Sequence, residues 1–210
     1  MIDSNIISFI SKGGVLVIPI FLCSVIALAI FCERLIRFAL MRSRGAGLAE
    51  KVADLLKKGE EKKAIDLANE SRSPMGRILV QAMDARDGDR EILETVIVNA
   101  TDEEVRYLSA YTQALATIGN IAPILGLLGT VIGMIKAFMV IQQMGGKVNA
   151  SVLAGGIWEA MLTTALGLAV ALPTMVAHSY LISKIDTYEA RLQKGSVTFL
   201  KSIFTHHQEL

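Results

Sequence analysis

Hydrophobic and polar positions are strongly segregated along this chain. Residues 15–32 and 107–135 contain no Lys, Arg, Asp or Glu, and in residues 148–183 the sole such residue is Glu159. A helix needs about 20 residues to cross roughly 30 Å of hydrocarbon, so each stretch is long enough or nearly so. Lipid cannot satisfy an open backbone, and three segments cannot close a barrel. Each stretch is therefore expected to be a transmembrane helix.

The basic residues around these stretches predict their orientation. Twelve of the 21 Lys and Arg lie between Arg42 and Arg106, whereas only Lys12 precedes the first stretch and only Lys147 lies in the link 142–151 between the second and third spans. An excess of Lys and Arg marks the cytoplasmic side. The expected segments are an external N-terminal segment (1–14), transmembrane helix 1 (15–40), a cytoplasmic helical segment (41–112), transmembrane helix 2 (113–141), an external loop (142–151), transmembrane helix 3 (152–182) and a cytoplasmic C-terminal tail (183–210).

The cytoplasmic segment has a helical pattern. Gly59 is expected to separate two short helices, and Ser73 with Pro74 to open a third. A further helix is expected to start near Asp89. Because no Pro or Gly lies between Asp89 and Gly119, this helix is expected to run without a break into the second span.

Sequence signals for an enzyme, a metal or a nucleic-acid partner are weak. The run GLLGTVIG lacks the Lys-Ser/Thr ending of a phosphate-binding loop and lies in a span. Cys23 and Cys32 point to opposite faces of one helix and are interpreted as packing residues. The histidines are His178 and the pair His206 and His207, which suit a solvated tail better than a metal site. Binding of nucleic acid is not indicated either, because the positive and negative charges of the cytoplasmic segment nearly balance. We expect no enzyme, no metal, no cofactor and no nucleic acid.

Glu159 raises the main functional question. An acid near the centre of a membrane helix costs about 2.5–3.5 kcal/mol on insertion scales, and nothing nearby in the sequence neutralises it. Two alternatives stay open: a protonated Glu that joins helices as structural glue, and a carboxylate that lines an ion path, which we favour. On an ideal helix, Gly155 and Thr163 share the face of Glu159, while Thr164 lies about 140° away.

The second span contains small residues at helical spacing. Gly129 and Gly133 lie four residues apart, and Gly126 lies four residues before Thr130, which favours close helix contact. These faces exceed what three helices are expected to bury, so the fold class is an all-α membrane protein that assembles as a helical oligomer, with long helices extending into the cytoplasm. Thr130 offers an oxygen either to its own backbone or to a cavity shared with Glu159.

Two prolines and one lysine complete the membrane pattern. Pro123 leaves a carbonyl of the preceding turn unsatisfied, which suits a helix beside a polar cavity. Pro173 and Gly167 interrupt the ideal geometry of the third span. Lys136 lies near the external end of the second span and is expected to snorkel, without a role in a channel.

The runs APILGLLGTVIGMIKAF and GGIWEAMLTTALGLAVALP together resemble the paired signature of the MotA/TolQ/ExbB proton channel family, closest to its ExbB/TolQ branch. The resemblance covers nearly the full length, including the SPMGRIL element. It implies a proton pathway that includes Thr130, Glu159 and Thr164; the helical wheel adds Thr163. Gly126, Gly129, Gly133, Gly155, Pro123 and Pro173 are then the helix-packing residues.

The resemblance also implies a function and partners. The chain would be the proton-channel or stator subunit of a bacterial inner-membrane motor, with its N-terminus outside and its C-terminus in the cytoplasm. A homo-oligomer, a pentamer, would surround an ExbD/TolR-like single-span partner with an intramembrane Asp, and a TonB-like energy transducer would follow. The sequence does not distinguish whether this motor would energise nutrient import, envelope maintenance or motility. From the residues alone, the alternative is a structural membrane scaffold in which Glu159 is interhelical glue.

Overall fold

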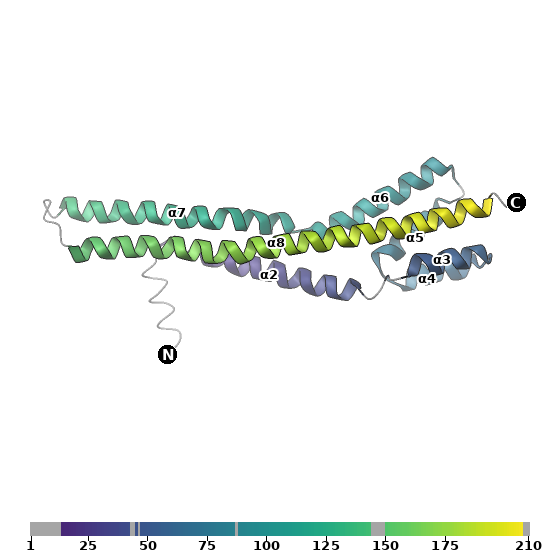
Figure 1. Cartoon of the computed structure of the whole chain (residues 1–210), viewed down its shortest axis with the longest axis horizontal. Helices are drawn as coiled ribbons and strands as arrows, with labels where there is room; N and C mark the ends of the chain where they lie inside the picture. Colours follow the sequence, from purple (N-terminus) through teal and green to yellow (C-terminus); the bar gives the residue numbers. More distant parts are fainter. Residues whose placement is uncertain (1–13, 43–44, 46, 87, 144–149, 208–210) are drawn as a thin grey trace. The chain divides into compact units, whose positions relative to one another are not determined.

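The computed structural model describes residues 14–42, 45, 47–86, 88–143 and 150–207, and for 42, 150–152 and 205–207 the backbone only. Every regular element among these residues is an α-helix (Figure 1). In chain order they are α2 (Val17–Arg42), α3 (Leu48–Lys57), α4 (Glu61–Glu70), α5 (Pro74–Asp84), α6 (Arg90–Ser109), α7 (Thr112–Gln143) and α8 (Ala150–His207).

Candidate membrane spans lie within Val17–Met41, Arg90–Gln143 and Leu153–Phe204 by length and composition. The expectation of an all-α membrane protein with three transmembrane helices is thereby confirmed. The expected external segment (1–14) and external loop (142–151) fall mostly outside the described residues, as do Lys12 and Lys147.

The helices form two compact units. The hairpin unit comprises Met1–Cys32 and Tyr111–Tyr180, and the bundle unit comprises Glu33–Ala110 and Leu181–Leu210. In the hairpin unit, α7 lies beside the first part of α8 and runs antiparallel to it (Figure 1).

The contact between α7 and α8 is a seam of small residues at spacings of three and four, which place them on one face of each helix. On α7 the buried seam residues are Gly119, Ala122, Gly126, Gly129, Gly133 and Ala137. On α8 they are Ala160, Thr163, Gly167, Ala171 and Thr174. Small side chains let two backbones approach closely, and this packing replaces the hydrophobic driving force that lipid does not provide.

The seam also accounts for the glycines on which the expectation of an oligomer rests. Gly126, Gly129 and Gly133 are all buried within the chain, against α8. A Cβ on Gly126 would lie 3.0 Å from the Cα of Thr164, and one on Gly133 would lie 2.8 Å from the Cβ of Ala160. The expectation that three helices cannot bury these glycines is wrong, because one antiparallel neighbour covers the whole stripe. An oligomer therefore needs another argument.

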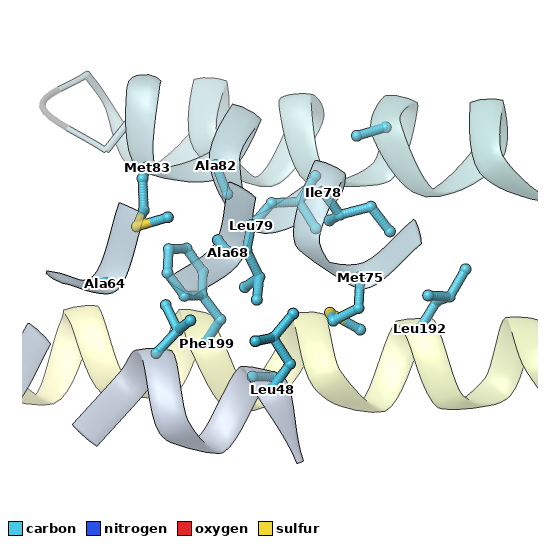
Figure 2. Close-up of a cluster of buried hydrophobic side chains, with 14 of the residues drawn as sticks. Leu48, Ala64, Ala68, Met75, Ile78, Leu79, Ala82, Met83, Leu192 and Phe199 are labelled. Carbon is cyan, nitrogen blue, oxygen red and sulfur yellow. The ribbon is translucent and has the colours of Figure 1, made fainter. Parts of the chain in front are cut away.

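The bundle unit has a hydrophobic core built from α3, α4, α5, α6 and α8 (Figure 2). Its central side chains, among them Ile78, Leu79 and Phe199, are almost completely buried. Gly59 has a φ of 72° between α3 and α4, a conformation that glycine adopts without steric cost. The Ser73 hydroxyl accepts a hydrogen bond from the Gly76 N–H at 3.1 Å and caps α5. The predicted helix boundaries at Gly59, at Ser73 and near Asp89 are confirmed.

The helix that begins after Asp89 does not run unbroken into the second span, so this prediction is wrong. α6 ends at Ser109, Tyr111 has a φ of 65°, and α7 begins at Thr112. The buried Arg34 of α2 donates hydrogen bonds to the carbonyls of Tyr107 (3.3 Å) and Leu108 (3.4 Å). A helix end leaves its last carbonyls without partners, and Arg34 satisfies two of them. A basic side chain from another helix stabilises the break without any Gly or Pro.

The third span and the expected C-terminal tail belong to one helix. α8 continues from Ala150 to His207, and Pro173 lies inside it. Beyond the membrane stretch, Leu192 and Phe199 of α8 enter the core of the bundle unit (Figure 2). The side chains of His206 and His207 lie outside the described residues.

Candidate functional site

Glu159 and Lys136 face each other across α7 and α8. The Lys136 Nζ lies 3.6 Å from the Glu159 Oε1, and the two side chains are 54% and 32% exposed. Lys136 is the sole Lys, Arg, Asp or Glu of α7, and Glu159 is the sole one of α8 before Lys184. The single base of α7 and the single acid of this part of α8 thus lie side by side, which lowers the cost of placing either charge in the membrane.

The seam explains why these two residues meet. The contacts between Gly133 and Ala160 and between Ala137 and Gly156 fix the register of α7 against α8. This register places Lys136 beside Glu159, although they lie 23 positions apart in the sequence. No neighbour in sequence neutralises Glu159, and the cation beside it comes from the adjacent helix. That Lys136 has no role in a channel stays a prediction, but nothing in the sequence indicates that its ammonium group lies next to this carboxylate.

A second neighbour of the Glu159 carboxylate lies just before α2. A Cβ placed on Gly14 would lie 2.6 Å from the Glu159 Oε1, so the carboxylate is close against this backbone. Gly14 has a φ of 74° and precedes α2, which begins at Val17. The N–H groups of Val17 and Ile18 donate to the carbonyls of Gly14 and Val15 within this turn. In the described part of the chain, the cation beside the carboxylate is therefore Lys136, and Gly14 is a close backbone neighbour.

The three candidate threonines hydrogen-bond to backbone carbonyls. Thr163 donates to the carbonyl of Glu159 at 2.9 Å, and Thr130 donates to Leu127 at 2.6 Å. Thr164 donates across the seam to the Gly126 carbonyl at 2.9 Å. Within the described residues, neither Thr130 nor Thr164 bonds to the Glu159 carboxylate. Each hydroxyl keeps acceptor capacity after donating, so these oxygens remain able to accept a proton-bearing group.

The candidate packing residues Pro123, Pro173 and Gly155 differ in their surroundings. Pro123 and Pro173 lie inside continuous helices, and the residue four positions before Pro123 is the seam glycine Gly119. No atom lies within 4 Å of a Cβ built on Gly155, whereas one on Gly156 would lie 2.7 Å from the Cβ of Ala137. Within the chain, Gly156 rather than Gly155 faces α7.

Sequence reasoning missed the α8 side of the seam. A small residue recurs at positions 156, 160, 163, 167, 171 and 174, the same three-and-four spacing as on α7. A Cβ on Gly167 would lie 2.6 Å from the Ala122 carbonyl oxygen, which makes Gly167 one of the tightest positions. The spacing is visible in the sequence, but only a matching stripe on α7 identifies it as a contact.

The bundle unit holds a second charged cluster. Arg77 of α5 binds both carboxylate oxygens of Glu104 of α6, each at 2.5 Å. This hydrogen bonding raises the pKa of Arg77. Burial raises the pKa of Tyr188 of α8, and the nearby negative charge of Glu104 raises it further. Each charge here has a fixed partner, so the cluster joins helices. Among the described residues no group of His, Cys, Asp and Glu is arranged to hold a metal ion.

The two apolar helices pack closely, and one acid and one base face each other between them. These features define a multi-pass helical membrane protein that places charged groups within the bilayer. The chain belongs to the MotA/TolQ/ExbB proton channel family, whose model matches residues 70–194. This is a family of channel and transport components, not a family of enzymes.

Individual relatives agree with the ExbB/TolQ branch. The biopolymer transport protein ExbB of Salmonella typhimurium is 31% identical over 83% of this chain and 75% of its own length. Biopolymer transport protein exbB1 of Vibrio cholerae is 28% identical over 86% of this chain and 80% of its own length. A putative ExbB-like protein of Synechocystis is 29% identical over 78% of this chain and 79% of its own length.

Proposed function

We propose that the chain is the proton-channel subunit of an inner-membrane motor that couples the proton motive force to energy-dependent transport or envelope work. The Lys136–Glu159 pair is the observation that carries this proposal. Membership of a proton channel family supports it, as do relatives named as biopolymer transport proteins.

The proposed work of Glu159 follows from its surroundings. The Glu159 carboxyl group, held beside Lys136 and close to Gly14, is an ionisable group inside an apolar hairpin. It attracts a proton entering from the aqueous side, and the hydroxyl oxygens of Thr130 and Thr164 provide further polar positions along α7 and α8. Each proton that crosses 100 mV supplies about 2.3 kcal/mol. That energy is enough to drive a movement between this chain and a partner.

The partner completes the proposed motor. We infer a single-span ExbD/TolR-like protein whose intramembrane Asp exchanges protons with the path that contains Glu159. Several copies of this chain, a pentamer in our proposal, would surround the partner's helices, and a TonB-like transducer would carry the movement outward. Because the seam glycines are buried within each copy, this assembly rests on family membership and not on those glycines.

The proposed location is the bacterial inner membrane. The excess of Lys and Arg in residues 42–106 supports a cytoplasmic bundle unit, an external N-terminus and a cytoplasmic C-terminus. In this orientation the Lys136–Glu159 pair lies toward the external end of the hairpin.

A structural scaffold is the second candidate, because an acid paired with a base across two helices also suits interhelical glue. Glu159→Gln distinguishes the two functions, since Gln keeps the shape and hydrogen bonding but carries no charge and exchanges no proton. Partner-dependent proton flux into vesicles, at matched protein amounts, is the measurement. We expect assembly to persist and flux to be lost.

The matched control is Glu103→Gln, which removes an exposed acid from α6. It is expected to leave proton flux unchanged. Full flux in Glu159→Gln would remove Glu159 from the proton path and favour the scaffold function.

A further inference from the structure

A hollow of about 630 Å³ lies in the bundle unit, between the end of α2 and the start of α5. Its walls combine apolar and charged side chains. Ile36, Leu40 and Met41 form the apolar part, and Arg37, Arg72 and Glu33 form the charged part. The proposed proton path does not involve any of these residues.

The apolar wall belongs to the end of a membrane span. α2 supplies the candidate span Val17–Met41, so Ile36 and Leu40 occupy its last turns. These two residues are 62% and 59% exposed. Apolar side chains at the end of a span that stay exposed in the chain are positioned to contact the first carbons of lipid chains.

The charged wall holds two arginines that differ in their partners. Arg37 is bound to Glu33 at 2.8 Å and lies over the Tyr107 ring at 4.8 Å, which sets the position of its guanidinium. Arg72 is exposed, and the described residues provide it with no ion-pair partner. Two arginines against one glutamate leave the hollow with one excess positive charge.

The backbone holds Arg72 at this place. Arg72 has a φ of 44°, a conformation that is uncommon for a residue with a side chain. Its N–H donates to the carbonyl of Asn69, and the Ser71 hydroxyl donates to the carbonyl of Ala68 at 2.8 Å. These bonds fix the turn between α4 and α5, so Arg72 is presented to the hollow by a defined turn.

We propose that this hollow binds the headgroup of an anionic phospholipid. The phosphate is held between Arg37 and Arg72, because guanidinium groups bind phosphate oxygens through directed, charge-assisted hydrogen bonds. The acyl chains run along Ile36 and Leu40. A water-soluble phosphate would contact the arginines but would gain no binding free energy from the two apolar side chains. A lipid at the edge of the membrane contacts the charged wall with its headgroup and the apolar wall with its acyl chains.

The test is native mass spectrometry of the full-length protein in mild detergent with added phosphatidylglycerol or phosphatidylcholine. Wild type is expected to retain phosphatidylglycerol in preference to phosphatidylcholine. Arg72→Gln is expected to lower phosphatidylglycerol retention about fivefold, the effect of losing one basic contact to an anionic lipid. Arg72→Lys is expected to restore most of it. The control Lys57→Gln with Lys58→Gln removes two exposed charges of the same unit and is expected to change nothing.

Two further results separate a lipid site from a simple anion site. Leu40→Ser is expected to reduce phosphatidylglycerol retention, because it removes the apolar contact without changing the charge. Competition by inorganic phosphate at equal concentration would overturn the proposal, since it would show that the acyl chains add nothing. Equal retention of both lipids, or retention unchanged in Arg72→Gln at wild-type thermal stability, would also overturn it. None of these outcomes depends on proton flux, so this proposal and the proposed function fail separately.

Discussion

Lys136 and Glu159 show how much of an ion pair's contribution depends on burial. Losing one partner of a fully buried pair costs about 3–5 kcal/mol, whereas an exposed pair contributes about 0–1 kcal/mol. This pair, with a separation of 3.6 Å and side chains 54% and 32% exposed within the chain, lies between these two cases, because lipid screens charge less than water does. Removing the lysine is therefore expected to cost about 1–3 kcal/mol.

Lys136→Met is the direct test, because Met keeps the length and apolar stem of the side chain. We expect a fall of a few degrees in the thermal midpoint in detergent, and a smaller fall or none in Lys136→Arg. Once Glu159→Gln has removed the charge of its partner, the same Lys136→Met change is expected to cost much less. Such non-additivity is the signature of a direct interaction. Strictly additive effects of Lys136→Met and Glu159→Gln would show that the two groups do not interact.

Among the helices, α7 and α8 depend on the absence of side chains along their seam. Gly167→Ala would place a methyl group 2.6 Å from the Ala122 carbonyl oxygen and 3.1 Å from the Gly126 Cα, both backbone atoms that cannot turn aside. The helices would have to separate, at a cost of about 1–3 kcal/mol. Thermal unfolding and the amount of folded protein extracted from membranes are the measurements.

Gly155→Ala is the control for this change, since it makes the same substitution on the same helix where nothing lies within 4 Å. Alanine favours a helix over glycine by up to about 1 kcal/mol, so stability is expected to stay level or rise. A loss of stability in Gly155→Ala with none in Gly167→Ala would contradict the seam.

In the bundle unit, Tyr188 links stability to alkaline pH. Its pKa is raised above 10.0 in the folded chain because burial disfavours the phenolate. The folded state then keeps a proton that the unfolded chain loses, so this contribution to stability is fully present below pH 10.0 and is lost as the pH rises through the raised value. Tyr188→Phe is expected to lose stability less steeply than wild type above that pH. Identical pH profiles of the thermal midpoint would show that Tyr188 does not titrate differently on folding.

Across the full chain, local patterns predict most of the helices but not the contacts between them. The three apolar stretches and the boundaries at Gly59 and Ser73 follow from hydrophobicity, glycine and capping. The break at Tyr111 could not be predicted, because the side chain that stabilises it is Arg34, more than 70 residues away. The continuation of α8 into the bundle core was likewise hidden by charged residues beside Leu192.

The candidate site shows the same limit. Glu159 can be recognised in the sequence because an acid in a membrane helix carries a free-energy cost. The glycines of α7 can be recognised because they recur at helical spacing. The choice between Gly155 and Gly156 needs the register of α8 against α7, and so does the partnership with Lys136. Register is set by the whole seam, and no short motif contains it.

The pairing of the two lone charges also bears on how the protein is made. On translocon-insertion scales an isolated lysine or acid costs about 2.5–3.5 kcal/mol at the centre of a helix. α7 and α8 are consecutive helices, so the ribosome delivers both charges within a short interval. A hairpin that closes its seam before lipid surrounds it enters the bilayer with no net charge in its membrane stretch. The lysine thus makes the acid tolerable during biogenesis, before any assembled complex exists to use it.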